Sequence, residues 1–176
     1  MGRIKSIYDL LMDTVENTLV HIDYIHHEIH EGKFHTAIVK FESLGDAGIG
    51  DLYFKAPDTT VRCHVFGYFA TEGLAEFAVR RSATITASGS QITSYNNDHN
   101  SALSATAIVR SSPTITASGT LVGLTQAGGG KGSGVYGGSA GSRIEFIAKQ
   151  GTIYIFRITS RAATNDGTIT LEWYEA

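Results

Sequence analysis

The chain has 176 residues, of which 42% are hydrophobic and 18% are charged, and its formal net charge is −3 at pH 7. This length supports one domain with a substantial core, and the apolar content excludes an intrinsically disordered protein. The small negative charge argues against a broad nucleic-acid-binding face. No apolar run reaches the roughly 18 residues of a membrane-spanning helix, so we expect neither nucleic acid nor a membrane as a partner.

The first segment with a clear period is residues 4–19, and the period is helical. Apolar side chains recur every three or four residues, which places them on one face of an amphipathic helix. These residues are Ile4, Ile7, Tyr8, Leu11 and Val15. So short a helix is marginal alone, so it must pack on its own domain or on a partner. We predict an N-terminal amphipathic arm over residues 1–20, followed by a β-domain over residues 21–176.

From residue 20 onward the pattern changes to that of β-strands. Segments rich in β-branched and aromatic residues alternate with short turn signals that contain Gly, Pro, Asn or Asp. The segments are Val20–Ile25, His35–Glu42, Val61–Ala70, Leu74–Val79, Arg143–Lys149, Thr152–Thr159 and Thr168–Tyr174. Thr152–Thr159 is apolar on both faces, which predicts a central, covered strand. Short strands with frequent turns are typical of a β-sandwich or barrel, so we predict an all-β antiparallel fold.

One pattern of eleven residues occurs twice, thirty residues apart: Val79–Gly89 and Val109–Gly119 share Val-Arg, a Ser and the run Thr-Ile-Thr-Ala-Ser-Gly. Two copies are too few for a solenoid, so we interpret them as two equivalent strand–turn units in one sheet system. An Asn-rich loop, Tyr95–Ser101, lies between the copies, and a Gly-rich loop over residues 127–142 follows the second.

Histidines gather before the first long strand, at His26, His27 and His30, with Glu28 among them. Imidazole and carboxylate groups bind metals, and on a strand His26, Glu28 and His30 share one face. The spacing matches neither the His-x-His of cupins nor the His-Glu-x-x-His of zinc proteases. We therefore predict no metal and no cofactor, and interpret the cluster as a His/Glu hydrogen-bond network at a strand end or subunit contact. A cupin-like metalloenzyme is the alternative that this cluster would support.

The remaining candidate catalytic motifs fail on their context. Lys131 in the Gly-rich loop is followed by Gly132 rather than by Ser or Thr, so the loop is not a Walker phosphate loop. Gly137–Gly141 matches Gly-x-Ser-x-Gly, but no helical pattern follows it, as a nucleophile elbow requires. Cys63 and His64 point to opposite faces of a strand and form no dyad, so Cys63 is expected in the core. We therefore expect that the protein is not an enzyme.

The chain ends on an aromatic pair, Trp173 and Tyr174, of which Trp173 is the one tryptophan. Such a pair can be a binding patch for a sugar or a protein. We favour the interpretation that the last strand locks into the core, with one ring on each face.

Several of these segments together resemble a known family. Ile22–Gly32, with the sequence IDYIHHEIHEG, resembles the opening signature of a family of small tailed-bacteriophage virion proteins. The paired Thr-x-Thr-Ala-Ser-Gly turns, the Asn-rich loop, the Gly-rich loop and the closing Glu172–Glu175 follow in the order found in that family. The resemblance covers about residues 22–176, and the amphipathic segment 4–19 lies outside it.

The resemblance implies a jelly-roll or related β-sandwich that acts as a capsid decoration (cement) protein. Such a protein binds the outer surface of the virion's major capsid lattice as a homotrimer and stabilises the expanded head. The implied partners are the major capsid protein, further copies of the chain and adjacent trimers. The alternative is a receptor- or glycan-binding head-fibre or tail component on the same fold. We predict the capsid or inter-subunit contacts on the apolar face of the arm and at His26, His27, Glu28, His30, Lys131 and Tyr136.

Overall fold

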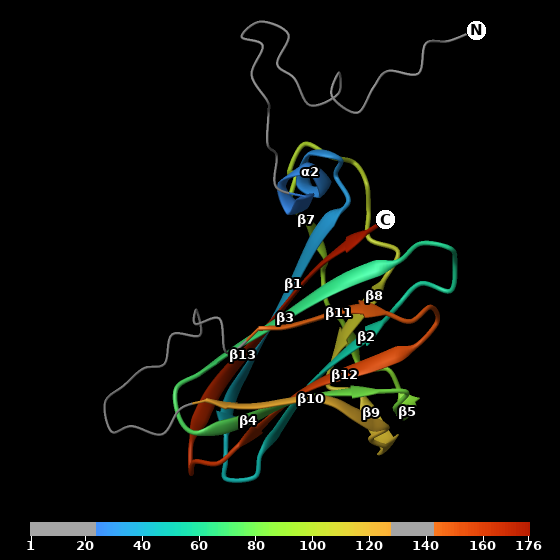
Figure 1. Cartoon of the computed structure of the whole chain (residues 1–176). Helices are drawn as coiled ribbons and strands as arrows, with labels where there is room; N and C mark the ends of the chain where they lie inside the picture. Colours follow the sequence, from blue (N-terminus) through green and yellow to red (C-terminus); the bar gives the residue numbers. More distant parts are fainter. Residues whose placement is uncertain (1–23, 128–142) are drawn as a thin grey trace, which may run out of the picture.

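The computed structural model describes residues 24–127 and 143–176, which fold as an antiparallel β-sandwich with one short helix (Figure 1). The predicted all-β class is therefore confirmed. The predicted contact residues of the arm and of the Gly-rich loop lie outside the described residues: Ile4, Ile7, Tyr8, Leu11, Val15, Lys131 and Tyr136.

The helix α2 covers Tyr24–His30. The strands follow in chain order as β1 Phe34–Leu44, β2 Ile49–Lys55, β3 Cys63–Thr71, β4 Ala75–Arg81, β5 Thr84–Ala87, β6 Ser90–Gln91, β7 Tyr95–Asn96, β8 Ile108–Ser111, β9 Thr114–Ala117, β10 Thr120–Ala127, β11 Ile144–Ala148, β12 Ile153–Ser160 and β13 Asn165–Glu175. The predicted strands after residue 34 are confirmed, with boundaries that differ by a few residues.

The longer strands have jelly-roll connectivity. One sheet has the order β11-β3-β13-β1-β7, and the other has the order β10-β4-β12-β2-β8-β6. The first four strands therefore alternate between the two sheets, and the first long strand pairs with the last, as in a jelly roll. The segment between β4 and β10 is an insertion in this plan. It adds β6 and β8 to one sheet and β7 to the other, and pairs β5 with β9 in a separate ribbon.

The core lies between the two sheets. Along β13, Ile169, Leu171 and Trp173 alternate with outward residues, and all three are 0% exposed. Trp173 meets Phe54 of the opposite sheet edge to face, with the ring centroids 5.6 Å apart. Tyr174 lies on the other face of β13, in a separate cluster of aromatic residues. The prediction of one terminal ring on each face of the last strand is confirmed.

The two repeat copies are related by a pseudo-two-fold axis through the six-stranded sheet. Arg80 of the first copy lies opposite Ile155 of β12, and the equivalent Arg110 lies opposite Tyr53 of β2. Ile155 and Tyr53 lie opposite each other. Counted inward from the two edges of the sheet, β10 thus corresponds to β6, β4 to β8 and β12 to β2. The predicted equivalence holds for β4 and β8 and also for β5 and β9, where Ile85 lies opposite its counterpart Ile115. The expectation of one sheet system is wrong for β5 and β9, which leave the six-stranded sheet and pair with each other.

The β5–β9 ribbon covers the outer face of the six-stranded sheet. Tyr53, Ala83 and Ile155 are buried there, and Ile85 and Ile115 of the ribbon pack against them. Phe156 points into the main core, so its neighbour Ile155 points to the outer face of the sheet. Ile155 is nevertheless 0% exposed, because the ribbon covers this face. The prediction that Thr152–Thr159 is covered on both faces is therefore confirmed.

The final glycine of each copy packs against the backbone of the other copy. Gly89 has a φ of 81° and Gly119 a φ of 71°, which non-glycine residues adopt at a cost. A Cβ atom on Gly89 would lie 2.0 Å from the carbonyl oxygen of Ser111, and one on Gly119 would lie 2.3 Å from that of Arg81. Ser111 and Arg81 are equivalent positions, so each copy ends against the backbone of the other.

The segment before β1 corrects the sequence prediction. Tyr24–His30 is helical, so the expected strand is wrong at Tyr24 and Ile25, and its remainder lies outside the described residues. Ile25 and Ile29, four residues apart, pack on one aromatic cluster. Gly32, with a φ of 67°, ends the helix: its N–H donates to the Ile29 carbonyl at 2.9 Å. No helix in the described residues is long and apolar enough to cross a bilayer.

Replacing either repeat glycine should destabilise the sandwich. We expect Gly89→Ala and Gly119→Ala each to lower the free energy of unfolding by about 1–3 kcal/mol, because each adds strain at a positive φ and a backbone clash. Gly45→Ala is the control, since its Cβ would find no atom nearer than 3.9 Å. Urea denaturation measures all three, and a control-like effect at either repeat glycine would contradict the reciprocal packing.

Candidate functional site

The helix α2 is seated on the outer face of the five-stranded sheet, where β1 begins and β13 ends (Figure 1). Phe34, Phe66 and Tyr174 form an aromatic patch there, and each is less than 10% exposed. Ile25 and Ile29 of α2 pack on this patch. The helix therefore shields large aromatic rings that the alternation of the strands directs away from the core.

A hydrogen-bonded chain of polar side chains crosses the sheet beside the patch. Glu145 Oε1 lies 2.8 Å from Nε2 of His64, and Nδ1 of His64 is hydrogen-bonded to the Tyr174 hydroxyl. Arg143 donates to Glu145 at 2.6 Å, and its guanidinium carbon lies 4.4 Å from the centroid of the Phe66 ring. This hydrogen-bond network links β11 through β3 to β13 and so connects the three strands to the aromatic patch.

A carboxylate, an imidazole and a hydroxyl in this order can activate a nucleophile. Here the pKa of the Tyr174 hydroxyl is raised, mainly by burial and further by the nearby charges of Tyr24, Glu28 and Glu145. The hydroxyl lies in the aromatic patch with only 8% of Tyr174 exposed, so its hydrogen bond to His64 holds the Tyr174 ring in position.

Glu28 lies on the inner side of α2 and is 3% exposed. Its Oε1 lies 3.5 Å from His27 Nδ1, and its Oε2 is buried without a hydrogen-bond partner. The pKa of the Tyr24 hydroxyl is raised by desolvation and then by its hydrogen bond to Glu28. Glu28 thus belongs to the contact between helix and sheet, and the expected common face with His26 and His30 is wrong.

The helix brings His26 and His30 together on its exposed side. They are four residues apart, and their Nε2 atoms are 3.0 Å from each other. His27 is exposed on a different side. The predicted His/Glu network is therefore split into a His26–His30 pair and a His27–Glu28 pair. No group of three or more His, Cys, Asp or Glu residues able to hold a metal occurs within residues 24–127 and 143–176.

The Asn-rich loop holds the turn between α2 and β1, a role that the sequence analysis missed. Asn96 Nδ2 donates to the Gly32 carbonyl at 2.6 Å and to the Leu103 carbonyl at 3.0 Å. The Asn97 N–H donates to the Phe34 carbonyl at 2.9 Å. Asparagine side chains bridge backbone groups in this way, but the loop composition alone does not name the partners.

A second surface lies along the open edge, the name we give to strands β10 and β11, which end their respective sheets. A Cβ on Gly123 of β10 would lie 2.9 Å from the side chain of Ile144 of β11, so the two edges are adjacent. The opposite edges are β6 and β7, with two residues each. Exposed apolar side chains follow the open edge: Leu121 at 45%, Val122 at 47%, Leu124 at 54% and Ile147 at 61%.

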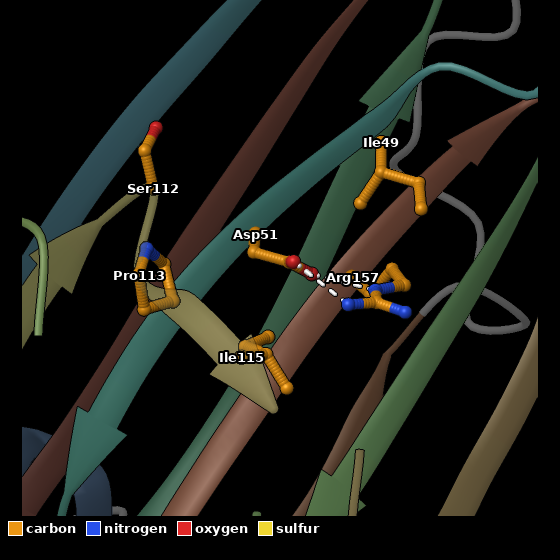
Figure 2. A pocket seen from close by; sticks show the side chains of 6 residues that line it. All are labelled: Ile49, Asp51, Ser112, Pro113, Ile115 and Arg157. Carbon is orange, nitrogen blue, oxygen red and sulfur yellow. Dashed lines mark hydrogen bonds and ion pairs between the residues drawn. The ribbon is translucent and has the colours of Figure 1, made fainter. Parts of the chain in front are cut away.

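An open recess of about 340 Å³ lies between the outer face of the six-stranded sheet and the β5–β9 ribbon (Figure 2). Asp51 and Arg157 form a two-point ion pair in it, with N–O distances of 2.7 and 2.8 Å. Figure 2 shows these side chains pointing toward each other from neighbouring strands, with Pro113 and Ile115 beside them. The hydrogen bond to Asp51 raises the pKa of Arg157. The two charges therefore neutralise each other within the protein.

Cys63 is 1% exposed, and burial raises the pKa of its thiol to about 12. Its side chain lies in the main core, on the opposite face of β3 from His64. The prediction of a small core residue is confirmed.

No family model, no curated protein and no solved structure matches the chain. The resemblance to bacteriophage virion proteins therefore remains a prediction that rests on the motifs and their order.

The Tyr174 ring should control how firmly α2 is held. We expect Tyr174→Ala to speed amide hydrogen exchange at Glu31 and Lys33 at least about tenfold, because these amides close the end of the helix. Tyr174→Phe keeps the ring and should leave their exchange close to that of the parent. Exchange in β12 reports global opening, and equal rates at Glu31 and Lys33 in all three proteins would contradict this role.

Proposed function

We propose that the protein is a capsid decoration protein that binds the outer surface of a phage's major capsid lattice as a homotrimer and stabilises the expanded head. The capsid context comes from the resemblance. The structural observation that carries the proposal is the apolar open edge, because it favours lateral contact between subunits. The proposal assigns no enzymatic activity, no cofactor and no nucleic-acid or membrane partner.

The open edge has the properties of a protein–protein contact surface. β10 has eight residues, and within the described residues only β4 pairs with it. Monomeric proteins usually shorten, charge or cover such edges, whereas this one carries Leu121, Val122 and Leu124 in exposed positions. Interface cores are rich in apolar and poor in charged residues. In a closed ring of copies, each open edge would contact one fixed surface of the next copy.

The helix α2 supports attachment to the capsid in a different way. It follows directly on residues 1–23 and is anchored on the aromatic patch, so it gives the arm a fixed point on the sandwich. His26, His27 and His30 are exposed there and remain our candidate contacts with the major capsid protein or an adjacent trimer.

Charges on the open edge should break the trimer. We expect the parent to have three times the 18.9 kDa mass of one chain by native mass spectrometry, and Leu121→Glu with Leu124→Glu to be mainly monomeric, because burying two charges is unfavourable. Ile38→Glu is the control, since Ile38 is 56% exposed but lies on β1. A monomeric parent, or a trimer that tolerates both charges, would contradict the open edge as the trimer contact.

The copy number in virions tests the decoration role itself. We expect quantitative peptide mass spectrometry of purified particles to give a ratio near one to one with the major capsid protein. A lattice-wide protein must be present in such numbers. A few copies per particle would refute lattice decoration and favour the receptor- or glycan-binding head-fibre or tail component instead.

A further inference from the structure

We propose that His26 and His30 form an open two-histidine site for a divalent transition-metal ion of the Ni²⁺, Cu²⁺ and Zn²⁺ class. Both ligands lie on α2, and the proposal does not depend on the virion role. Neutral imidazole nitrogens are preferred ligands of all three ions.

The separation of the two nitrogens fits two bonds to one ion. The Nε2 atoms are 3.0 Å apart, and the ring planes are inclined by 77°. Metal–nitrogen bonds are about 2.0–2.1 Å long, so two nitrogens bound at a right angle lie about 2.9 Å apart. At a tetrahedral angle they lie about 3.4 Å apart. The pair thus has the spacing of adjacent ligands of Ni²⁺ or Cu²⁺, and a small ring rotation suits Zn²⁺.

The backbone that carries the pair is held in place before any ion arrives. Ile25 and Ile29 fix α2 on the aromatic patch, and Gly32 and Asn96 fix its end. Ligands on an anchored helix lose little conformational freedom on binding, which favours chelation.

The hydrogen bond between the rings directs both Nε2 atoms to the same space. In the neutral pair, one Nε2–H donates to the lone pair of the other Nε2. When an ion binds, the donor ring carries its proton on Nδ1 instead, and both Nε2 lone pairs bind the ion. Both side chains are exposed, so the ion reaches them directly from solvent.

Within the described residues, two side chains serve as ligands, and the other coordination positions are left to water. Glu28 is buried on the inner side of α2, and Glu31 lies 3.5 Å from the Lys33 ammonium. A site with two protein ligands is weaker than the four-ligand structural sites of zinc proteins. We therefore expect reversible binding of one ion per chain.

Calorimetric titration of the full chain, without an affinity tag and after chelator treatment, tests the site with NiCl₂ and ZnCl₂. We expect one ion per chain, and at least about tenfold weaker binding in His26→Ala and in His30→Ala. Both residues are exposed, so both variants should fold, which circular dichroism checks. His27→Ala and His99→Ala are matched controls at exposed histidines and should bind like the parent.

An independent readout counts the ligands. In the electron paramagnetic resonance spectrum of the Cu²⁺-loaded parent we expect coupling to two imidazole nitrogens, reduced to one in either alanine variant. No binding by the parent, unchanged binding in His26→Ala and His30→Ala, or an equal loss in the controls would overturn the proposal.

Discussion

The pairing of the first long strand with the last is the constraint on which the other features depend. Phe34 lies opposite Tyr174, and the ladder continues to Phe41 opposite Gly167. This pairing closes the jelly roll and brings two of the three aromatic rings under α2 together. Because these rings come from opposite ends of the domain, the surface on which α2 packs depends on a non-local strand pairing.

The end of β13 also holds the segment that lies between the two repeat copies. The Glu175 carboxylate accepts hydrogen bonds from Trp173 Nε1 at 3.0 Å and from the backbone N–H groups of Thr106 and Ala107 at 3.0 and 2.9 Å. His35 lies beside Trp173, and burial lowers the pKa of its imidazole. His35 of β1 and Glu175 of β13 thus both contact Trp173, and the hydrogen bonds of Glu175 position the segment at Thr106 and Ala107.

The sequence predicts those elements whose own residues carry the pattern. Strand β13 alternates clearly and strand β12 is apolar on both faces, so the burial of each follows from its own residues. The sequence pattern does not indicate α2, because His26, Glu28 and His30 fit one face of a strand, although Ile25, Ile29 and Gly32 carry a helical spacing and a stop signal. The sequence does not indicate the strand β2 either, because Gly50 and Asp51 interrupt its apolar pattern. Only its pairing with β12 identifies it as a strand. The His26–His30 pair depends on the helix, and the open edge depends on topology, so neither could be predicted locally.

The pseudo-two-fold repeat has a consequence for polymerisation. The first copy leads into β6, with two residues, whereas the second leads into β10, with eight. Within the described residues the six-stranded sheet therefore has one long free end and one short end. Growth of a fibre by strand addition needs two long free edges in each molecule, one to receive a strand and one to offer it. The unequal ends of a duplicated motif thus allow this sheet to associate while protecting it from amyloid-like extension.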